Sequence, residues 1–159
     1  MNKEQISKTR KNFNDTLAYD IKLTEKYSKI LVSQLFANIN AGVSPEEFMA
    51  LDNIYHKPDI CQRDIAKLII KDRANTGRLM DSLEKKGLIT REAQLKNNKL
   101  IKKIILSEAG VDKINEILEK LMPVYETISS EFSKEEIDLV KDVLKRIRIS
   151  MKKIVDIQI

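Results

Sequence analysis

Residues 72–89, DRANTGRLMDSLEKKGLI, decide the fold, because they contain the start, the buried face and the end of one helix. Asp72 is a residue type that caps helix N-termini, and Gly87 is the type that commonly follows a helix C-terminus. Between them, weakly polar and apolar residues recur at the spacing of one helix face: Thr76, Leu79, Met80 and Leu83. We therefore predict a helix over residues 73–86 with this face turned inward.

A shorter helix is predicted just before this one, over residues 61–69, CQRDIAKLI. Its apolar residues Ile65, Leu68 and Ile69 are spaced to face the protein interior. Only two residues separate this segment from Asp72, so the two helices meet at a tight turn. This order is typical of a helix-turn-helix unit.

After Gly87 the pattern changes to two runs that are compatible with β-strands, residues 88–91 and residues 100–106. They flank a basic, turn-forming segment, residues 96–99, so a two-stranded hairpin is predicted. Helix, tight turn, helix and hairpin predict a winged helix-turn-helix, whose second helix enters the major groove of DNA while the hairpin lies along a neighbouring groove. The chain is expected to be mainly α with this small β-hairpin.

The predicted recognition helix offers side chains suited to DNA contact near its start. Arg73, Asn75 and Thr76 suit guanine, adenine, and phosphate or base oxygens respectively, and Arg78 follows one turn later. Two alternatives remain open, because the arginines can pair with carboxylates of their own helix and Thr76 can turn its hydroxyl toward the core. Gly77 weakens a helix interior, which indicates a close approach of the backbone either to DNA or to the preceding helix.

Positive charge is concentrated around this unit. Of the 29 Lys and Arg residues, 13 lie between Lys57 and Lys103, together with only 6 of the 24 Asp and Glu residues. The rest of the chain is slightly acidic, although the whole carries a formal charge of +5. A basic segment between such arms is typical of a module that binds a polyanion, with an unevenly charged solvated surface as the alternative.

Amphipathic helices are predicted on both sides of the winged unit. One covers about residues 15–39, and another begins with the capping box of residues 44–47, SPEE, and runs to about His56. After the hairpin, Ser107 caps a further helix, and residues 133–136 form a second capping box before the last one. The last two helices carry apolar stripes, and each stripe serves either as core within one chain or as a surface for another chain.

Three segments resemble the MarR family of bacterial regulators. Residues 62–66, QRDIA, resemble the family's Q-x-x-L-A helix, and residues 72–89 are similar to its D-R-S-x-x-x-R-L-x-D-x-L-E-x-K-G-L-V run. Residues 106–110, LSEAG, resemble its L-T-x-x-G entry to the helix after the wing. The resemblance runs from about Asp15 to Lys153, and residues 72–89 are its most specific part.

This resemblance implies a homodimer in which the first helix and the last two helices interleave and place two winged units over a pseudo-palindromic operator. Residues 1–43 and 107–159 are then dimerisation segments around a DNA-binding domain over residues 44–106. The expected dimer contacts come from the apolar stripes of the outer helices: Leu17, Ile21, Ile137, Val140, Leu144, Ile147 and Met151. The implied function is a sequence-specific, double-stranded DNA-binding transcription regulator that acts as a ligand-responsive repressor.

The effector implied by the resemblance is a small anionic or phenolic molecule, bound between the dimerisation helices and the winged unit. The sequence itself names no such molecule. Phe36, Phe48 and Tyr55 are candidates for lining its pocket, with ordinary core positions as the alternative.

The wing departs from the family pattern, whose tip usually carries an acidic residue followed two positions later by arginine. Here residues 97–100 read NNKL. We therefore expect Lys96, Asn98 and Lys99 to contact DNA mainly by attracting phosphates, and Arg91 at the base of the hairpin is the remaining arginine candidate.

Several classes of function are not expected. No apolar run approaches the roughly 20 residues of a membrane span and the N-terminus lacks a signal peptide, so we expect a cytoplasmic protein without a membrane partner. One cysteine and one histidine are too few for an internal disulfide or a metal site. No catalytic constellation is apparent, so neither an enzyme nor a cofactor is expected.

Two alternatives to a DNA-binding regulator remain open. The winged unit can dock a protein partner instead of DNA, or Cys61, at the start of a helix, can act as a redox-sensing thiol. RNA binding is disfavoured because aromatic residues, which stack on exposed bases, make up only 5% of the chain.

Overall fold

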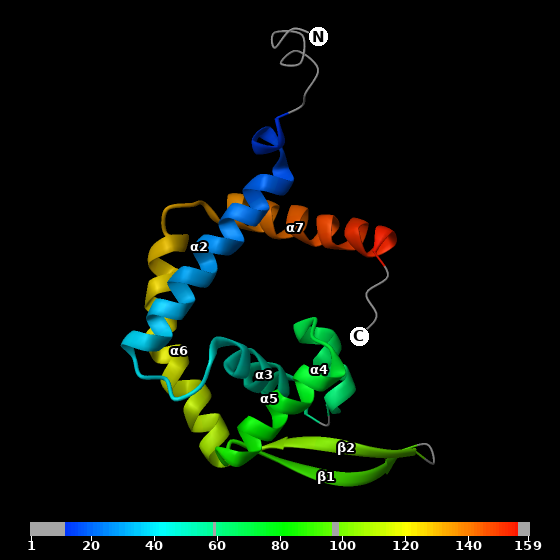
Figure 1. Ribbon diagram of the computed structural model, residues 1–159. Helices are drawn as coiled ribbons and strands as arrows, with labels where there is room; N and C mark the ends of the chain where they lie inside the picture. The colour runs from blue at the N-terminus through cyan, green and yellow to red at the C-terminus, as the bar shows by residue number, and fades with distance from the viewer. Residues whose placement is uncertain (1–11, 59, 97–98, 156–159) are drawn as a thin grey trace, which may run out of the picture. The chain divides into compact units, whose positions relative to one another are not determined.

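The computed structural model describes residues 12–58, 60–96 and 99–155, with the backbone alone described for residues 94–96 and 99–102 (Figure 1). The chain divides into two compact units, Met1–Asn40 and Ala41–Ile159. Within the described ranges, no helix combines the length and the apolarity needed to cross a membrane.

The first unit holds a short 3-10 turn, η1 (Phe13–Asp15), and the long helix α2 (Leu17–Asn38). Thr16 caps α2, since its hydroxyl accepts a hydrogen bond from the Tyr19 amide at 3.3 Å. The predicted helix over residues 15–39 is therefore confirmed. Much of its apolar surface is exposed within this unit, including Leu17 and Ile30.

The second unit begins with α3 (Pro45–His56), whose predicted capping box is present. The Glu47 amide donates to Ser44 Oγ at 3.1 Å, and the Ser44 amide donates to Glu47 Oε2 at 2.6 Å. Pro45 follows the cap directly, where a helix has no use for an amide hydrogen.

Helices α4 (Gln62–Ile69) and α5 (Arg73–Lys85) form the predicted helix-turn-helix. Helix α4 ends at Ile70, whose φ of 53° lies in the left-handed region that β-branched residues rarely adopt. The prediction was wrong for Leu68, which is exposed. Ile65 and Ala66 fill the inward face of α4 instead, and Leu68 lies on the side of this short helix that the core does not cover.

Strands β1 (Ile89–Lys96) and β2 (Lys99–Leu106) form an antiparallel hairpin, with Ile89 opposite Leu106 and Lys96 opposite Lys99. The first strand is longer than predicted, because pairing extends through Lys96 into the segment expected to be the tip. A further bridge pairs Cys61 with Lys103, and it attaches the start of α4 to the hairpin.

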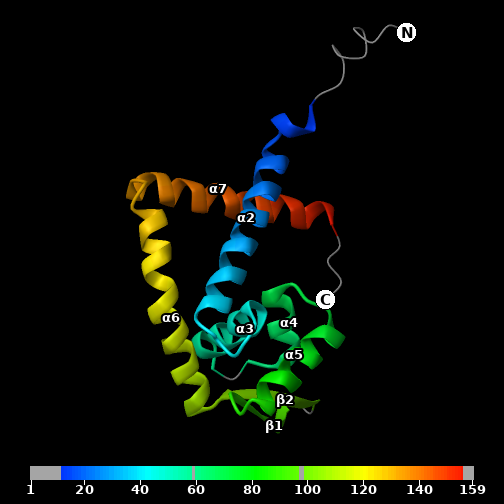
Figure 2. The same ribbon diagram turned by 60° about the vertical axis from the view of Figure 1, so that its left-hand side comes forward.

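One apolar core joins these elements, and the inward face predicted for α5 lies within it. Its largest fully buried side chains come from α3, α4, α5, both strands and α6 (Glu108–Ser129): Leu51, Ile65, Met80, Leu83, Ile89, Ile104, Ile114 and Ile117. In both views, α6 begins beside the root of the hairpin (Figures 1 and 2). The core therefore fixes the position of α5 from several sides.

Gly110 permits the close approach of α6 to the end of α5. A Cβ atom at this position would lie 2.2 Å from the Leu88 carbonyl oxygen, which no side chain tolerates. Nearby, the Ser107 hydroxyl donates to the Gly87 carbonyl at 2.7 Å and caps α6 by accepting from the Gly110 amide. The glycine of the LSEAG segment thus has a packing role.

Helix α7 (Lys134–Ile154) differs from the others because none of its residues is buried within the chain. Its predicted capping box is present, with Ser133 and Glu136 bonded in both directions. The apolar residues Val140, Leu144 and Met151 are all exposed. An amphipathic helix of 21 residues therefore presents an uncovered apolar face.

Candidate nucleic-acid interface

Three side chains on the exposed surface of α5 form a chain of hydrogen bonds. Asp72 Oδ1 accepts from the Asn75 amide at 2.8 Å, which caps the helix, and Asp72 Oδ2 accepts from Asn75 Nδ2 at 2.5 Å. Asn75 Oδ1 in turn accepts from an Arg78 guanidinium nitrogen at 2.9 Å. The bonds from the Asn75 backbone and side chain lower the pKa of Asp72, so this group is a carboxylate at neutral pH.

The other two predicted contacts of this helix differ from each other. Arg73 is exposed and lines a small cavity of about 280 Å³ together with Gln62 and Arg63 of α4. Thr76 is fully buried, and its hydroxyl donates to the Asp72 carbonyl at 2.8 Å. Thr76 is therefore not a DNA contact, because its side chain belongs to the core.

Among the described residues, none packs so closely against Gly77 that a glycine is required. A Cβ atom there would meet only Gln62 Nε2, at 3.5 Å, which is an ordinary van der Waals contact. Packing against the preceding helix therefore does not explain this glycine. The other explanation, a close approach of DNA to the helix backbone, stays a prediction.

Arg91, the arginine predicted to contact DNA from the base of the hairpin, is engaged by two carboxylates of α5. Its guanidinium pairs with Asp81 at 2.7 Å and with Glu84, both on α5, and its side chain is only 16% exposed. These hydrogen bonds, the Glu84 bond above all, raise the pKa of Arg91, and the same bond lowers the pKa of Glu84. Arg91 therefore holds the base of the hairpin to the recognition helix. The carboxylates that were possible partners for Arg73 and Arg78 are engaged here.

Glu47 links the start of α3 to the end of α5. Its carboxylate is almost fully buried and accepts from Ser82 Oγ at 2.6 Å and from Lys86 Nζ at 2.7 and 2.9 Å, in addition to the Ser44 amide. Burial alone would raise the pKa of Glu47, but the bonds from Lys86, Ser82 and Ser44 outweigh it, and the pKa is lowered. The sequence showed the capping role of Glu47 but not this second role.

The predicted wing contacts lie outside the described side chains. Lys96 and Lys99 are described only by their backbone, as the last paired residues of the hairpin, and Asn98 lies outside the described residues altogether. Their contact with DNA stays a prediction.

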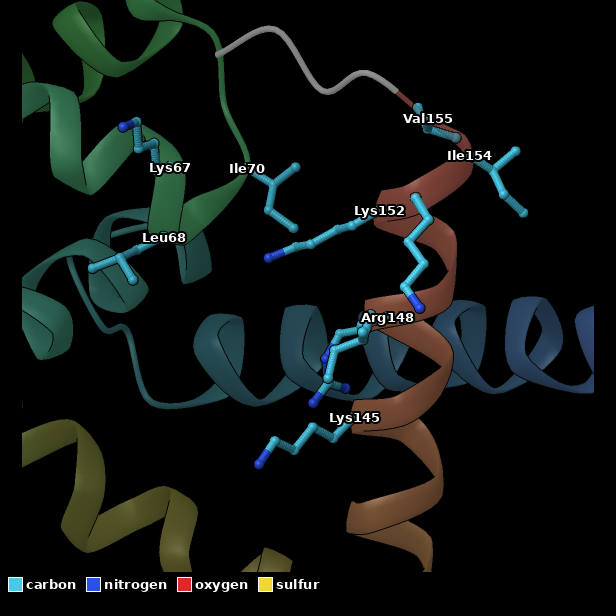
Figure 3. Close-up of a pocket in the computed structure, with 10 residues that line it drawn as sticks. Lys67, Leu68, Ile70, Lys145, Arg148, Lys152, Ile154 and Val155 are labelled. Atoms are coloured by element: carbon cyan, nitrogen blue, oxygen red, sulfur yellow. The ribbon is translucent and has the colours of Figure 1, made fainter.

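A cavity of about 900 Å³ lies between α4 and α7 (Figure 3). Its basic lining residues are Lys67, Lys145, Arg148, Lys152 and Lys153, and its apolar lining residues are Leu68, Ile70, Ile149, Ile154 and Val155. No acidic residue lines it among those described. Its combination of positive charge and aliphatic surface suits an amphipathic anion. None of the predicted aromatic residues lines it.

Cys61 occupies the N-cap position of α4 and is half-buried. Its Sγ donates to Asp64 Oδ2 at 3.0 Å. It is the only cysteine of the chain, so no second thiol of the same chain can pair with it. Nothing in this geometry favours the redox alternative.

The fold and the exposed face of α5 define the class of protein as a winged helix-turn-helix. Residues 43–101 match the model of the MarR family. The chain is 27% identical over 141 residues to the HTH-type transcriptional regulator MhqR of Bacillus subtilis (strain 168), across 82% of this chain and 97% of that protein.

Solved structures show the same fold at lower identity. A crystal structure of an S. aureus MepR–DNA complex matches with a TM-score of 0.72 and 23% identity, over 86% of this chain and 98% of that one. A MarR transcriptional regulator from Methanosarcina mazei matches with a TM-score of 0.71 and 18% identity, over 87% and 98%. Together, these findings show that residues 43–101 match the MarR family model and that the chain has the fold of solved MarR-type winged-helix regulators.

The Glu47 network predicts a loss of stability in Glu47→Gln. The free energy of unfolding should fall by about 1.5–3 kcal/mol at pH 7, because charge-assisted hydrogen bonds in a buried site are lost. The folded-state pKa is below the ordinary value of about 4.3, so the carboxylate stabilises the fold above that pH and this contribution disappears as pH falls through the folded-state pKa. Urea denaturation between pH 7 and pH 3, at one protein concentration, measures the difference.

The matched control is Glu46→Gln, which removes a neighbouring but exposed carboxylate that pairs with Lys71. It should change the unfolding free energy by less than about 0.5 kcal/mol. Equal effects of the two substitutions, or a Glu47→Gln effect that does not shrink in acid, would contradict the proposed linkage.

Proposed function

We propose that this protein is a sequence-specific, double-stranded DNA-binding transcription regulator that acts as a cytoplasmic homodimer and not as an enzyme. The observation that carries the proposal is the exposed face of α5, on which Arg73 and Arg78 stand free of acidic partners among the described residues. The relatives support it, because one is named a transcriptional regulator and one was crystallised with DNA. We assign DNA binding to residues 44–106.

The uncovered face of α7 supports dimerisation. Val140 is 55% exposed, Met151 is 48% exposed and Leu144 is 37% exposed. A soluble chain rarely leaves such a continuous apolar stripe uncovered, and a two-fold dimer buries the same stripe on both subunits. Residues 1–43 and 107–159 are the proposed dimerisation segments, with Leu17, Ile21, Ile137 and Ile147 as further contacts. Two winged units would then read a pseudo-palindromic operator.

The cavity between α4 and α7 supports ligand response, by which an anion would release a repressor from its operator. Lys145, Arg148 and Lys152 line it from one face of α7, which leaves the neighbouring stripe of Val140 and Leu144 available for a partner subunit. The cavity also contacts α4, the helix that supports the recognition helix. A bound molecule would therefore act on the position of the DNA-reading surface.

Selection of genomic fragments and gel-shift titration test DNA binding. The wild-type protein should select discrete fragments, and its affinity should fall steeply with salt, because phosphate contacts release counterions. Arg78→Ala should weaken binding to a selected fragment by about 1–3 kcal/mol if this arginine contacts a base. The matched control is Arg146→Ala on α7, where the arginine pairs with Asp142, and it should retain affinity.

Binding that ignores salt or selects no fragment would contradict the proposal. Such a result, combined with capture of a specific protein, would favour the winged unit as a protein-docking module.

Sedimentation tests the dimer. The wild-type protein should have twice the 18.4 kDa mass of the chain. Leu144→Glu should raise the dimer dissociation constant at least about a hundredfold, since each subunit would bury an unpaired carboxylate at the interface. Ser150→Glu is the control, because Ser150 is exposed on the same helix outside the stripe. A monomeric wild type, or an undiminished dimer of Leu144→Glu, would refute the interface.

Thermal denaturation with 2-hydroxybenzoate tests the anion site. The anion should raise the melting temperature and weaken operator binding, whereas neutral benzamide should do neither. Replacing both Arg148 and Lys152 by Ala should weaken the anion's effect about tenfold or more, because two charged contacts are lost. The control replaces Lys141 and Arg146, which lie on the same helix outside the cavity. Equal losses in the two double variants would place the anion elsewhere.

A further inference from the structure

We infer that Asn75 is a positioning residue that orients Arg78 for base reading and does not itself read adenine. This inference rests on the proposed DNA-binding function and concerns the division of work within the recognition helix. Three side chains carry it: Asp72, Asn75 and Arg78, which lie three residues apart along one face of α5.

The side-chain amide of Asn75 is engaged at both ends. Its Nδ2 donates to Asp72 Oδ2 at 2.5 Å and its Oδ1 accepts from Arg78 at 2.9 Å. Only one orientation of the amide satisfies a carboxylate on one side and a guanidinium on the other, because the oxygen accepts and the nitrogen donates. The charged partners make both bonds stronger than bonds between neutral groups.

Adenine recognition by asparagine needs the same two atoms, one to accept from N6 and one to donate to N7. Asn75 uses one N–H and one oxygen lone pair in these bonds and keeps one of each, but the two bonds fix the plane of its amide between Asp72 and Arg78, so the amide cannot turn freely toward a base. Arg78, by contrast, spends one donor on Asn75 and keeps four, and two of these suffice for the O6 and N7 atoms of guanine. The hydrogen bonds therefore favour Arg78 as the residue that contacts a base and Asn75 as the residue that positions it.

The hydrogen bond from Arg78 to Asn75 reduces the conformational entropy that the arginine side chain loses on binding DNA. An exposed arginine samples many rotamers, and binding must fix one of them. Asp72 is itself fixed, because its other oxygen caps α5 through the Asn75 amide at 2.8 Å. The hydrogen bonds that cap α5 thus continue through Asn75 to the Arg78 guanidinium. The conformation of this guanidinium therefore depends on the N-terminus of the helix.

A double-mutant cycle on a selected operator tests the inference. Asn75→Ala should raise the dissociation constant about threefold to tenfold and relax the preference at the same base pair as Arg78→Ala. The double variant should bind within about twofold of Arg78→Ala alone, because the two residues act through one contact. Asn115→Ala, on the exposed side of α6, is the asparagine control and should bind as the wild type does.

Asp72→Asn separates positioning from folding. Asparagine caps helices about as well as aspartate does, so α5 should keep its cap and the free energy of unfolding should fall only slightly. Its side chain cannot offer two acceptor oxygens, so the hold on Asn75 is lost and the preference at the Arg78 base pair should fall about threefold or more, measured as the ratio of operator to mismatched-operator affinity.

Two results would overturn the inference, and they are distinguishable from each other. If Asn75→Ala and Arg78→Ala relax different base pairs and their fold-changes multiply in the double variant, Asn75 reads a base of its own and the proposed function stands. If the wild-type protein selects no operator, the proposed function fails and the inference fails with it.

Discussion

A buried carboxylate sets the geometry on which the DNA-reading surface depends. Glu47 closes the capping box of α3 and receives Ser82 and Lys86 from the far end of α5, so one side chain joins the start of one helix to the end of another. A carboxylate in this position is costly unless each of its bonds is made. The arrangement therefore permits little rotation of α5 against α3. The positions of the exposed arginines of α5 are fixed by the same contacts.

The end of α5 is fixed a second time by close backbone packing. Gly87 takes a φ of 70°, and the Leu88 amide returns to the Leu83 carbonyl at 3.0 Å, which closes the helix. The Leu88 carbonyl then lies against Gly110 of α6. Helix, hairpin and α6 meet at this junction, so a change in the direction of α6 must reach the recognition helix. In the proposed dimer, an interface on the outer helices would thereby influence the spacing of the two recognition helices.

The sequence predicted the elements well, because capping residues and helical periodicity are local signals. Asp72, Gly87 and the two capping boxes lie where the pattern placed them. It failed for Leu68, because an apolar residue on a helix of eight residues can lie on either side of the inward face. The first strand was too short in the prediction, since residues 92–96, EAQLK, contain neither a β-branched nor an aromatic residue to indicate a strand.

The site could be predicted in location but not in detail. Residue type alone placed Arg91 among the DNA contacts, whereas only the fold brings Asp81 and Glu84 beside it. The same holds for the cations of α7 that line the cavity with Lys67, a residue far away in sequence. Thr76 was predicted both as part of the inward face of α5 and as a DNA contact. It is fully buried, so its position in the helical spacing was a better guide than its hydroxyl group.

The charges of α5 show why such partners matter for function. The helix and its cap carry three carboxylates, Asp72, Asp81 and Glu84, close to a surface that must attract phosphates. Asp81 and Glu84 share the single positive charge of Arg91, and Asp72 accepts a hydrogen bond from Asn75, which in turn accepts one from Arg78. The acidic groups therefore hold the hairpin to α5 through Arg91 and contact Arg78 through Asn75. Arg73 and Arg78 have no acidic partner among the described residues, so their positive charge is available to a phosphate or a base.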